Sequence, residues 1–367
     1  MLGGRTNSVE IAGGTFSVTN QMRFIDGTEN TLTFSGGRAE IAKQISENAS
    51  RKMLVRVEGD ACVRFPNGLS LNGISNTLEV VGGSLWTDSF TMKLGGDGSR
   101  FTFTGGAVTG NVEFAANDTT VTIGDGVCHV GRREDDWHGT HSSLIFTSGK
   151  ANQVLIISNG TYICEKPFCN VYESAANRSN AQYSEAIPFT NCPNSRIEFR
   201  GESPAFVMTS PKKYGTAGAE WQTFAIGQML NPTTMNWTRS HFEIVNPVRL
   251  RYVMPEDGYE QAPFRNTYAS RGGTVGGNAQ FEFDMTSYKW PKNKARIPLI
   301  HDAGGFYGYG GKDPAYRNID VEGLNITNAE RLPSNPRGKK CHLELSDDGL
   351  MLQLVVPGMA GMVVLFR

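Results

Sequence analysis

The sequence predicts an all-β chain that folds as a right-handed parallel β-helix, a solenoid built from coils of about 23 residues. Three observations predict this fold: a short motif that repeats at a constant step, a composition of strand and turn residues, and a near absence of helical patterning. We expect regular coils over residues 1–205. Over 206–367 we expect larger, irregular coils and a C-terminal cap, continuous with the same solenoid.

The repeated motif is a short run of alternating apolar and polar residues that ends in Gly-Gly or Gly-Asp. Its first glycine stands at positions 13, 36, 59, 82 and 105, so four consecutive steps are 23 residues long. Weaker copies follow, and two columns are apolar in all copies. The first column holds Val9, Leu32, Val55, Leu78, Phe101, Val121, Leu144, Leu155 and Ile197. The second holds Ile11, Phe34, Val57, Val80, Phe103, Ile123, Phe146, Ile157 and Phe199.

These columns predict how the coils stack. Residues two apart on a strand point to the same side, so both columns face one core. A Gly-Gly step permits a turn that other residues resist, and a third apolar column follows it, which predicts a second inward strand. That column holds Phe16, Ala39, Cys62, Leu85 and Val108. Asn7, Asn30 and Asn76 share one position before the first strand, where they form a turn ladder or serve only as good turn residues.

Other all-β architectures fit the sequence less well. A sandwich or barrel also uses short strands and glycine turns, but neither needs a constant step with aligned apolar columns. A propeller blade needs about 40 residues or more. The repeat has one irregularity, because the copies that turn at positions 148 and 159 are too close for a full coil. One of these two copies must therefore lie on a different face of the solenoid.

Composition and charge favour a protein of strands and turns and argue against nucleic-acid-binding and membrane-spanning proteins. Glycine is abundant, with 43 residues, and only 19% of residues are charged, which is typical of many strands joined by tight turns. The one helical candidate, residues 39–51, is interrupted by Ser and Asn. The formal net charge is -1 and Lys and Arg are not clustered, so we expect no nucleic-acid partner. No run of 18 apolar residues exists, so we expect no membrane span.

The constant step is lost after residue 202, but strand-like runs continue. They cover residues 241–245, 248–254, 280–285, 297–300, 342–345, 351–356 and 362–366. Long stretches rich in Gly, Pro and Asn separate them. This pattern predicts larger coils with insertions, or a cap that hides the last open edge.

The start of the chain and its cysteines indicate in which cellular compartment we expect the protein. The chain opens in mid-pattern at residues 2–4 and carries no signal peptide, which we interpret as a trimmed exported protein; a genuine cytosolic start is the alternative. Cys164, Cys169 and Cys192 lie in one segment, and their spacing does not match a zinc site. A disulfide within 164–192 is expected if the protein is exported. Free buried thiols are an equal alternative.

The coil repeats resemble the β-helical passenger segments of autotransporter-like surface proteins of bacteria. Three later segments are also similar to that group, at residues 248–263, 295–305 and 343–352. The resemblance covers most of the chain, but its motifs are structural. It implies export and display at the cell surface, and it implies no particular reaction.

One insertion, at 131–141, concentrates charged and aromatic side chains. Carboxylates beside a histidine can perform acid and base chemistry on a sugar, which makes Asp135, Asp136 and His138 the catalytic candidates. Glu134, together with Asp135 and Asp136, is the candidate site for a calcium ion, and no other cofactor is expected. The alternative is a solvated polar loop with neither activity.

The same insertion and its neighbour supply candidates for ligand binding. They are Arg132, Trp137 and His141 from the first insertion and Tyr172 from the second, which spans 165–194. Trp137 can stack on a sugar ring, and the alternative is that it covers the coil beneath. Both insertions leave neighbouring coils, so the second can form a wall beside the first.

Three functional hypotheses follow. The leading one is an exported, surface-displayed β-helix that is structural, adhesive or glycan-contacting and has no identifiable catalytic motif. The second is a carbohydrate-active enzyme, a polysaccharide lyase or glycoside hydrolase. Such enzymes need clustered Asp with Arg or Lys on one strand face, and the outward positions here are Thr, Glu and Arg in no clustered order. The third is a trimer similar to a phage tailspike, although we expect a monomer.

Overall fold

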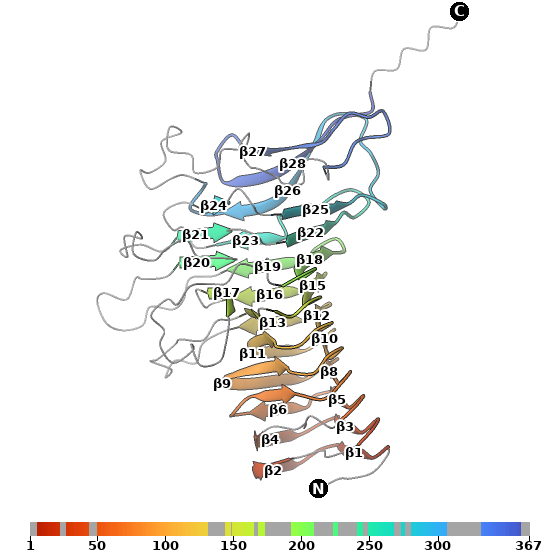
Figure 1. The fold of residues 1–367 in the computed structure, drawn as a ribbon, viewed down its shortest axis with the longest axis vertical. Coiled ribbons are helices and arrows are strands. Elements are labelled where there is room, and N and C mark those ends of the chain that lie inside the picture. Colours follow the sequence, from red (N-terminus) through yellow and green to blue (C-terminus); the bar gives the residue numbers. More distant parts are fainter. Residues whose placement is uncertain are drawn as a thin grey trace, which may run out of the picture.

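The fold was analysed in a computed structural model of the chain. It describes residues 6–22, 27–43, 50–130, 144–147, 149–164, 168–172, 192–208, 223–226, 241–244, 249–267, 273–275, 280–306 and 332–360. Within these ranges the secondary structure consists of strands, numbered β1 to β28, and contains no helix. The strands stack along one axis from the N-terminus to the C-terminus (Figure 1).

Ten strands form the first sheet, and all of them are parallel. They are β1 (Ser8–Ile11), β3 (Thr31–Phe34), β5 (Leu54–Val57), β8 (Thr77–Val80), β10 (Arg100–Phe103), β12 (Thr120–Ile123), β15 (Val154–Ser158), β18 (Arg196–Arg200), β22 (Arg249–Val253) and β25 (Gln280–Asp284). We call the chain from one of these strands up to the next a rung. Val9 pairs with Leu32 and Leu32 with Val55, so the two predicted apolar columns lie in register.

The second sheet is mixed and has two rows. The first row holds β2 (Thr15–Gln21), β4 (Arg38–Lys43), β6 (Cys62–Phe65), β9 (Ser84–Leu94), β11 (Ala107–Phe114), β13 (Val127–Val130), β16 (Thr161–Cys164), β19 (Ala205–Met208), β23 (Phe264–Asn266) and β26 (Ala295–Asp302). The second row holds β7 (Leu69–Leu71), β14 (Leu144–Thr147), β17 (Phe168–Tyr172), β20 (Thr223–Ile226), β21 (His241–Ile244) and β24 (Gly273–Val275). Within both rows neighbouring strands are parallel.

Strands β9 and β11 cross the corner between the two rows without a break. Residues 107–109 of β11 pair with β13, whereas 112–114 pair with β14. The bend lies at Gly110, whose φ is 152°. A Cβ atom at this position would lie 1.9 Å from Oγ1 of Thr87. The corner is therefore too tight for any side chain.

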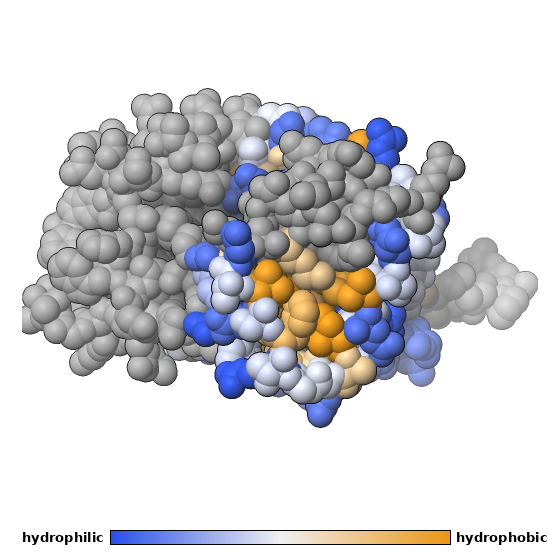
Figure 2. All heavy atoms as spheres, turned by 90° about the horizontal axis from the view of Figure 1, so that it is seen from below, coloured by the Kyte–Doolittle hydropathy of each residue, from blue (hydrophilic) through white to orange (hydrophobic). Residues whose placement is uncertain are grey.

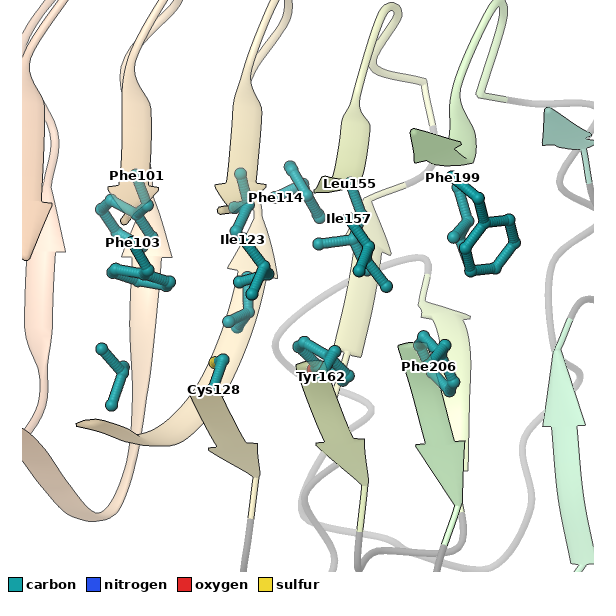
Figure 3. Close-up of a cluster of buried hydrophobic side chains, with 14 of the residues drawn as sticks. Phe101, Phe103, Phe114, Ile123, Cys128, Leu155, Ile157, Tyr162, Phe199 and Phe206 are labelled. Carbon is teal, nitrogen blue, oxygen red and sulfur yellow. The ribbon is translucent and has the colours of Figure 1, made fainter. Parts of the chain in front are cut away.

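Apolar side chains of the two sheets fill the space between them (Figure 3). Like residues stack on like. The rings of Tyr162 and Phe206 have centroids 5.0 Å apart, and those of Phe206 and Phe264 are 4.9 Å apart. All three side chains are fully buried. Each fully buried side chain of this size contributes about 1.5–3 kcal/mol relative to an exposed one.

A column of mostly polar and mostly buried residues precedes the strands of the first sheet. We call it the polar column; it holds Asn7, Asn30, Met53, Asn76, Ser99, Thr119, Gln153 and Ser195. Asn76 accepts the N–H of Met53 through Oδ1 at 2.9 Å and donates from Nδ2 to Ser50 Oγ at 2.9 Å. Asn30 Oδ1 accepts both the N–H and the Nδ2 of Asn7, at 2.9 and 3.0 Å. The predicted asparagine ladder is therefore confirmed between Asn7 and Asn30, and Asn76 ties neighbouring rungs. The residue before each position of the column has a positive φ. These residues are Thr6, Glu29, Lys52, Ser75, Gly98, Asp118, Asn152 and Asn194.

Three details of the sequence prediction were wrong. Val63, not Cys62, pairs with Ala39 and Leu85 in the third apolar column, because one extra residue stands in the turn before β6. The copy at 144–149, which the sequence pattern places in the first column, belongs to the second sheet, where β14 pairs with β11 and β17, so Leu155 follows Val121. The prediction that one of the two close copies lies on a different face is thereby confirmed. The described part of the helical candidate 39–51 is strand β4 and not helix.

The two ends of the stack differ. At the C-terminal end β26 pairs antiparallel with β28 (Met351–Val356), which pairs antiparallel with β27 (His342–Leu345). At the N-terminal end apolar residues gather at the centre of the exposed surface, with a hydrophilic rim (Figure 2).

In the part of the chain that the structure describes, we find no helix of the length and apolarity that a membrane crossing requires.

Candidate functional site

Most of the predicted site residues lie outside the described residues. These are Arg132, Glu134, Asp135, Asp136, Trp137, His138 and His141. Tyr172 ends β17, where its backbone pairs with Thr147, and its side chain is outside the described part. Catalysis, calcium binding and sugar binding by these residues remain predictions. Elsewhere in the described ranges, no group of three or more His, Cys, Asp or Glu is placed to hold a metal ion.

The first-row strands from β13 onward end at one common edge. Val130 pairs with Cys164, Cys164 with Met208, Met208 with Asn266, and Asn266 with Asp302. We call these five residues the insertion edge. The segments that follow these strand ends are 131–143, 165–167, 209–222, 268–272 and 307–331. Both insertions singled out in the sequence start from paired positions on neighbouring strands. The bounds predicted for the second, 165–194, were wrong, because Phe168–Tyr172 form strand β17 of the second sheet and only residues 165–167 lie between β16 and β17.

The insertion edge occupies the corner that β11 crosses without a break. His129 pairs with Thr109, and Leu144 pairs with Val112. In β11 only Gly110 and Asn111 stand between Thr109 and Val112. In the next rung residues 130–143 stand between the corresponding His129 and Leu144. The insertion therefore replaces a two-residue bend, and the strands on both sides keep their register.

A buried polar pair joins the last two ends of the insertion edge. Asn266 Nδ2 donates to Asp302 Oδ1 at 2.8 Å, and that oxygen also accepts the N–H of Gly304 at 3.1 Å. Both side chains are buried. On the outward face beside them Arg265 pairs in register with His301. Burial lowers the pKa of His301 below its ordinary value, so the imidazole is neutral at neutral pH.

A second candidate site lies on the outer face of the first sheet. Strands β18 and β22 carry Arg196, Arg200, Arg249 and Arg251 around Glu198. We call these five residues the arginine cluster. The sequence analysis found no clustering among outward positions, which was wrong. The reason is that β22 lies next to β18 in the sheet, although a long segment separates the two strands in the sequence.

Glu198 is the centre of the arginine cluster. Its side chain has no exposed surface. Oε2 lies 2.8 Å from Nε of Arg196 and 4.0 Å from Nε of Arg251, and Oε1 accepts a hydrogen bond from Nε of Arg200. A buried carboxylate is stable only when it is paired and hydrogen-bonded. Three guanidinium groups fulfil that condition here.

The contacts of Glu198 limit its chemistry. Both of its oxygens face cations, so it is poorly placed to accept or donate a proton in a reaction. The next carboxylates are Glu282, 3.4 Å from Arg251, and Asp284, 3.1 Å from Arg251. Hydrogen bonds from Thr286, helped by Arg251, hold the pKa of Asp284 below its ordinary value. The cluster is therefore a set of fixed charges that suits binding rather than proton transfer.

The described thiols are free. Cys192 is buried, with its Sγ 3.4 Å from the carbonyl oxygen of Thr147, and Cys128 and Cys341 are also buried. The side chains of Cys164 and Cys169 lie outside the described residues. A bridge between those two stays a prediction, and Cys192 takes no part in a bridge in this structure.

Comparison with known proteins identified no relative of this chain. No family model matches the sequence, and neither a curated protein nor a solved structure matches it. The resemblance to autotransporter-like passengers therefore rests on the sequence motifs alone.

Proposed function

We propose that the chain is a right-handed parallel β-helix, a solenoid that is exported and displayed at the cell surface. There it acts as a structural, adhesive or glycan-contacting protein. The solenoid is supported by the parallel, in-register first sheet and by the two parallel rows of the second sheet. Export and display are supported by the resemblance of the coil repeats to surface-protein passengers.

The insertion edge is the observation that carries the proposal for glycan contact. Its segments start from register partners, so their starting points lie one above another along the stack. Neighbouring strands are about 4.8 Å apart. A row of strand ends at this spacing suits an extended polymer better than a small molecule, because each rung can contribute one contact.

Three of the four described thiols, Cys128, Cys192 and Cys341, are buried, which is compatible with export, and the fourth, Cys62, is partly exposed. Burial raises the pKa of Cys192 to about 12 and that of Cys341 to about 11. Such thiols stay protonated at neutral pH, and the thiolate is the form that reacts. They therefore resist oxidation outside the cell without being paired.

The test is a binding and turnover screen of the full chain against neutral and acidic polysaccharides. The matched variant replaces residues 130–143 with Gly-Asn, the dipeptide with which β11 crosses the same corner. We expect the full chain to bind at least one glycan, to remain a monomer and to release no product. We expect the shortened variant to keep the far-UV circular dichroism of the full chain and to lose the binding.

Each other outcome points to a different function. New reducing ends or unsaturated products would replace the proposal with a carbohydrate-active enzyme. A stable trimer in solution would favour a tailspike-like protein. Equal binding by the shortened variant would remove the first insertion from the site, and a full chain that binds no glycan would overturn the proposal.

A further inference from the structure

The arginine cluster has an organised charge distribution on the outer face of the first sheet. Four guanidinium groups come from two adjacent strands, and a single carboxylate, Glu198, lies among them. The carboxylates on the next strand, Glu282 and Asp284, both lie close to Arg251. Arg196 and Arg200 share the buried Glu198, and the described partners of Arg249 are the neutral side chains of Gln280 and Asn194.

The inner edges of these arginines are held in place. Arg196 and Arg200 bind Glu198 through Nε. Arg249 donates from Nε to Gln280 Oε1 at 2.9 Å and from Nη1 to Asn194 Oδ1 at 3.3 Å. The side chains of Arg196 and Arg200 are 25% and 47% exposed. Arg196 also donates from Nη1 to the carbonyl oxygen of Asn194 at 3.4 Å. The guanidinium planes are therefore oriented before a ligand binds, which lowers the entropy lost when they bind an oxyanion.

The strand on the other side of the cluster is less polar. Ile156 of β15 pairs with Glu198, and Ser158 pairs with Arg200. Ile156 is partly exposed. A ligand that covers both strands would meet an apolar patch, a hydroxyl and a row of cationic donors. A sugar ring that carries a carboxylate or sulfate group has this combination of apolar face, hydroxyls and oxyanion.

We propose that the arginine cluster binds the oxyanions of an acidic glycan. The proposal rests on the proposed glycan contact and adds the outer face of the first sheet as a second contact surface beside the insertion edge. Carboxylated and sulfated sugars present the same oxyanion chemistry to a guanidinium fork. The experiment distinguishes the two sources.

The test measures binding of the full chain to polygalacturonate, dextran sulfate and neutral dextran at rising salt concentration. The main variant is Arg249→Gln, because Arg249 contacts Gln280 and Asn194 and leaves the buried Glu198 undisturbed. The matched control is Arg56→Gln. Arg56 lies on the same face in an earlier rung, but Glu58 and Glu79 surround it.

We expect binding to one acidic polymer, none to dextran, and loss of binding as salt screens the charges. Arg249→Gln should weaken that binding about tenfold, the effect of one charge-assisted hydrogen bond, while Arg56→Gln leaves it unchanged. The acidic polymer that binds identifies the oxyanion as carboxylate or sulfate.

Each result that contradicts these expectations would overturn a different part of the two proposals. Equal binding by wild type and Arg249→Gln, at equal melting temperature, would overturn the assignment to the cluster. Binding of dextran as well as the acidic polymers would overturn the oxyanion class and leave the proposed glycan contact standing. Absence of binding to every glycan would overturn both proposals. If shortening residues 130–143 to Gly-Asn leaves acidic binding intact, the cluster acts without the insertion edge.

Discussion

Asn76→Ala is expected to destabilise the fold at the polar column. The side chain is fully buried, and its Oδ1 accepts the N–H of Met53 while its Nδ2 donates to Ser50. The alanine variant leaves the N–H of Met53 without its acceptor, at a cost of about 1–3 kcal/mol, and loses a second hydrogen bond worth about 1 kcal/mol. We therefore expect the free energy of unfolding to fall by about 2–4 kcal/mol.

Asn7→Ala is the matched control, because Asn7 occupies the same column in the first rung and is only half-buried. Water can replace its side chain there, so we expect a loss of about 0.5–1 kcal/mol. Urea unfolding followed by circular dichroism measures the difference. Hydrogen exchange of the Met53 amide adds a local measure, since solenoids can unfold in parts. Equal losses for the two variants would refute the reasoning.

Three further predictions concern the turns and the thiols. Ser75→Gly should raise the free energy of unfolding by about 0.5–1 kcal/mol in a urea titration, because Ser75 has a φ of 56° that glycine adopts without strain; a loss of stability would contradict this. Gly106→Ala should lower it by more than about 1 kcal/mol, since Gly106 has a φ of 72° and its new Cβ would lie 2.4 Å from a carbonyl oxygen of the preceding rung; an unchanged midpoint would count against that contact. Burial raises the folded-state pKa of Cys128, Cys192 and Cys341 above the ordinary 9.0. Only the unfolded thiols ionise as pH rises above 9.0, so stability is present below that pH and falls by up to about 1.4 kcal/mol per pH unit for each thiol; replacing all three with Ala should flatten this slope.

The sequence predicted the columns of the core because their residues are apolar in every regular rung. It failed at Cys62, where the next residue, Val63, is also apolar and one extra turn residue decides which of the two points inward. It also failed at Leu144, whose local pattern matches a first-sheet strand. The close spacing of the two copies showed that one of them leaves the first sheet, and the pairing of Leu144 with Val112 shows which one.

Two features of the candidate sites had no signal in the sequence. The positive φ values before the polar column occur at residues of seven different types, so no side chain marks the position. The arginine cluster joins Glu198 with Arg251, its register partner on β22. In the sequence, outward positions can be aligned only through the constant step. The segment between Glu198 and Arg251 breaks that step, so the two residues could not be matched.

The pairing register of the strands is constant in this solenoid, whereas the number of residues from one rung to the next varies. This combination explains why the scaffold can carry functional sites. The cost of closing a loop grows slowly with its length, so an insertion at the corner removes little stability. His129 and Leu144 keep the pairing that Thr109 and Val112 have one rung earlier, although the insertion lies between them. The core and the polar column thus fix where every strand lies. Sequence at the insertion edge can then change without moving the arginine cluster, which makes the two surfaces separable by mutation.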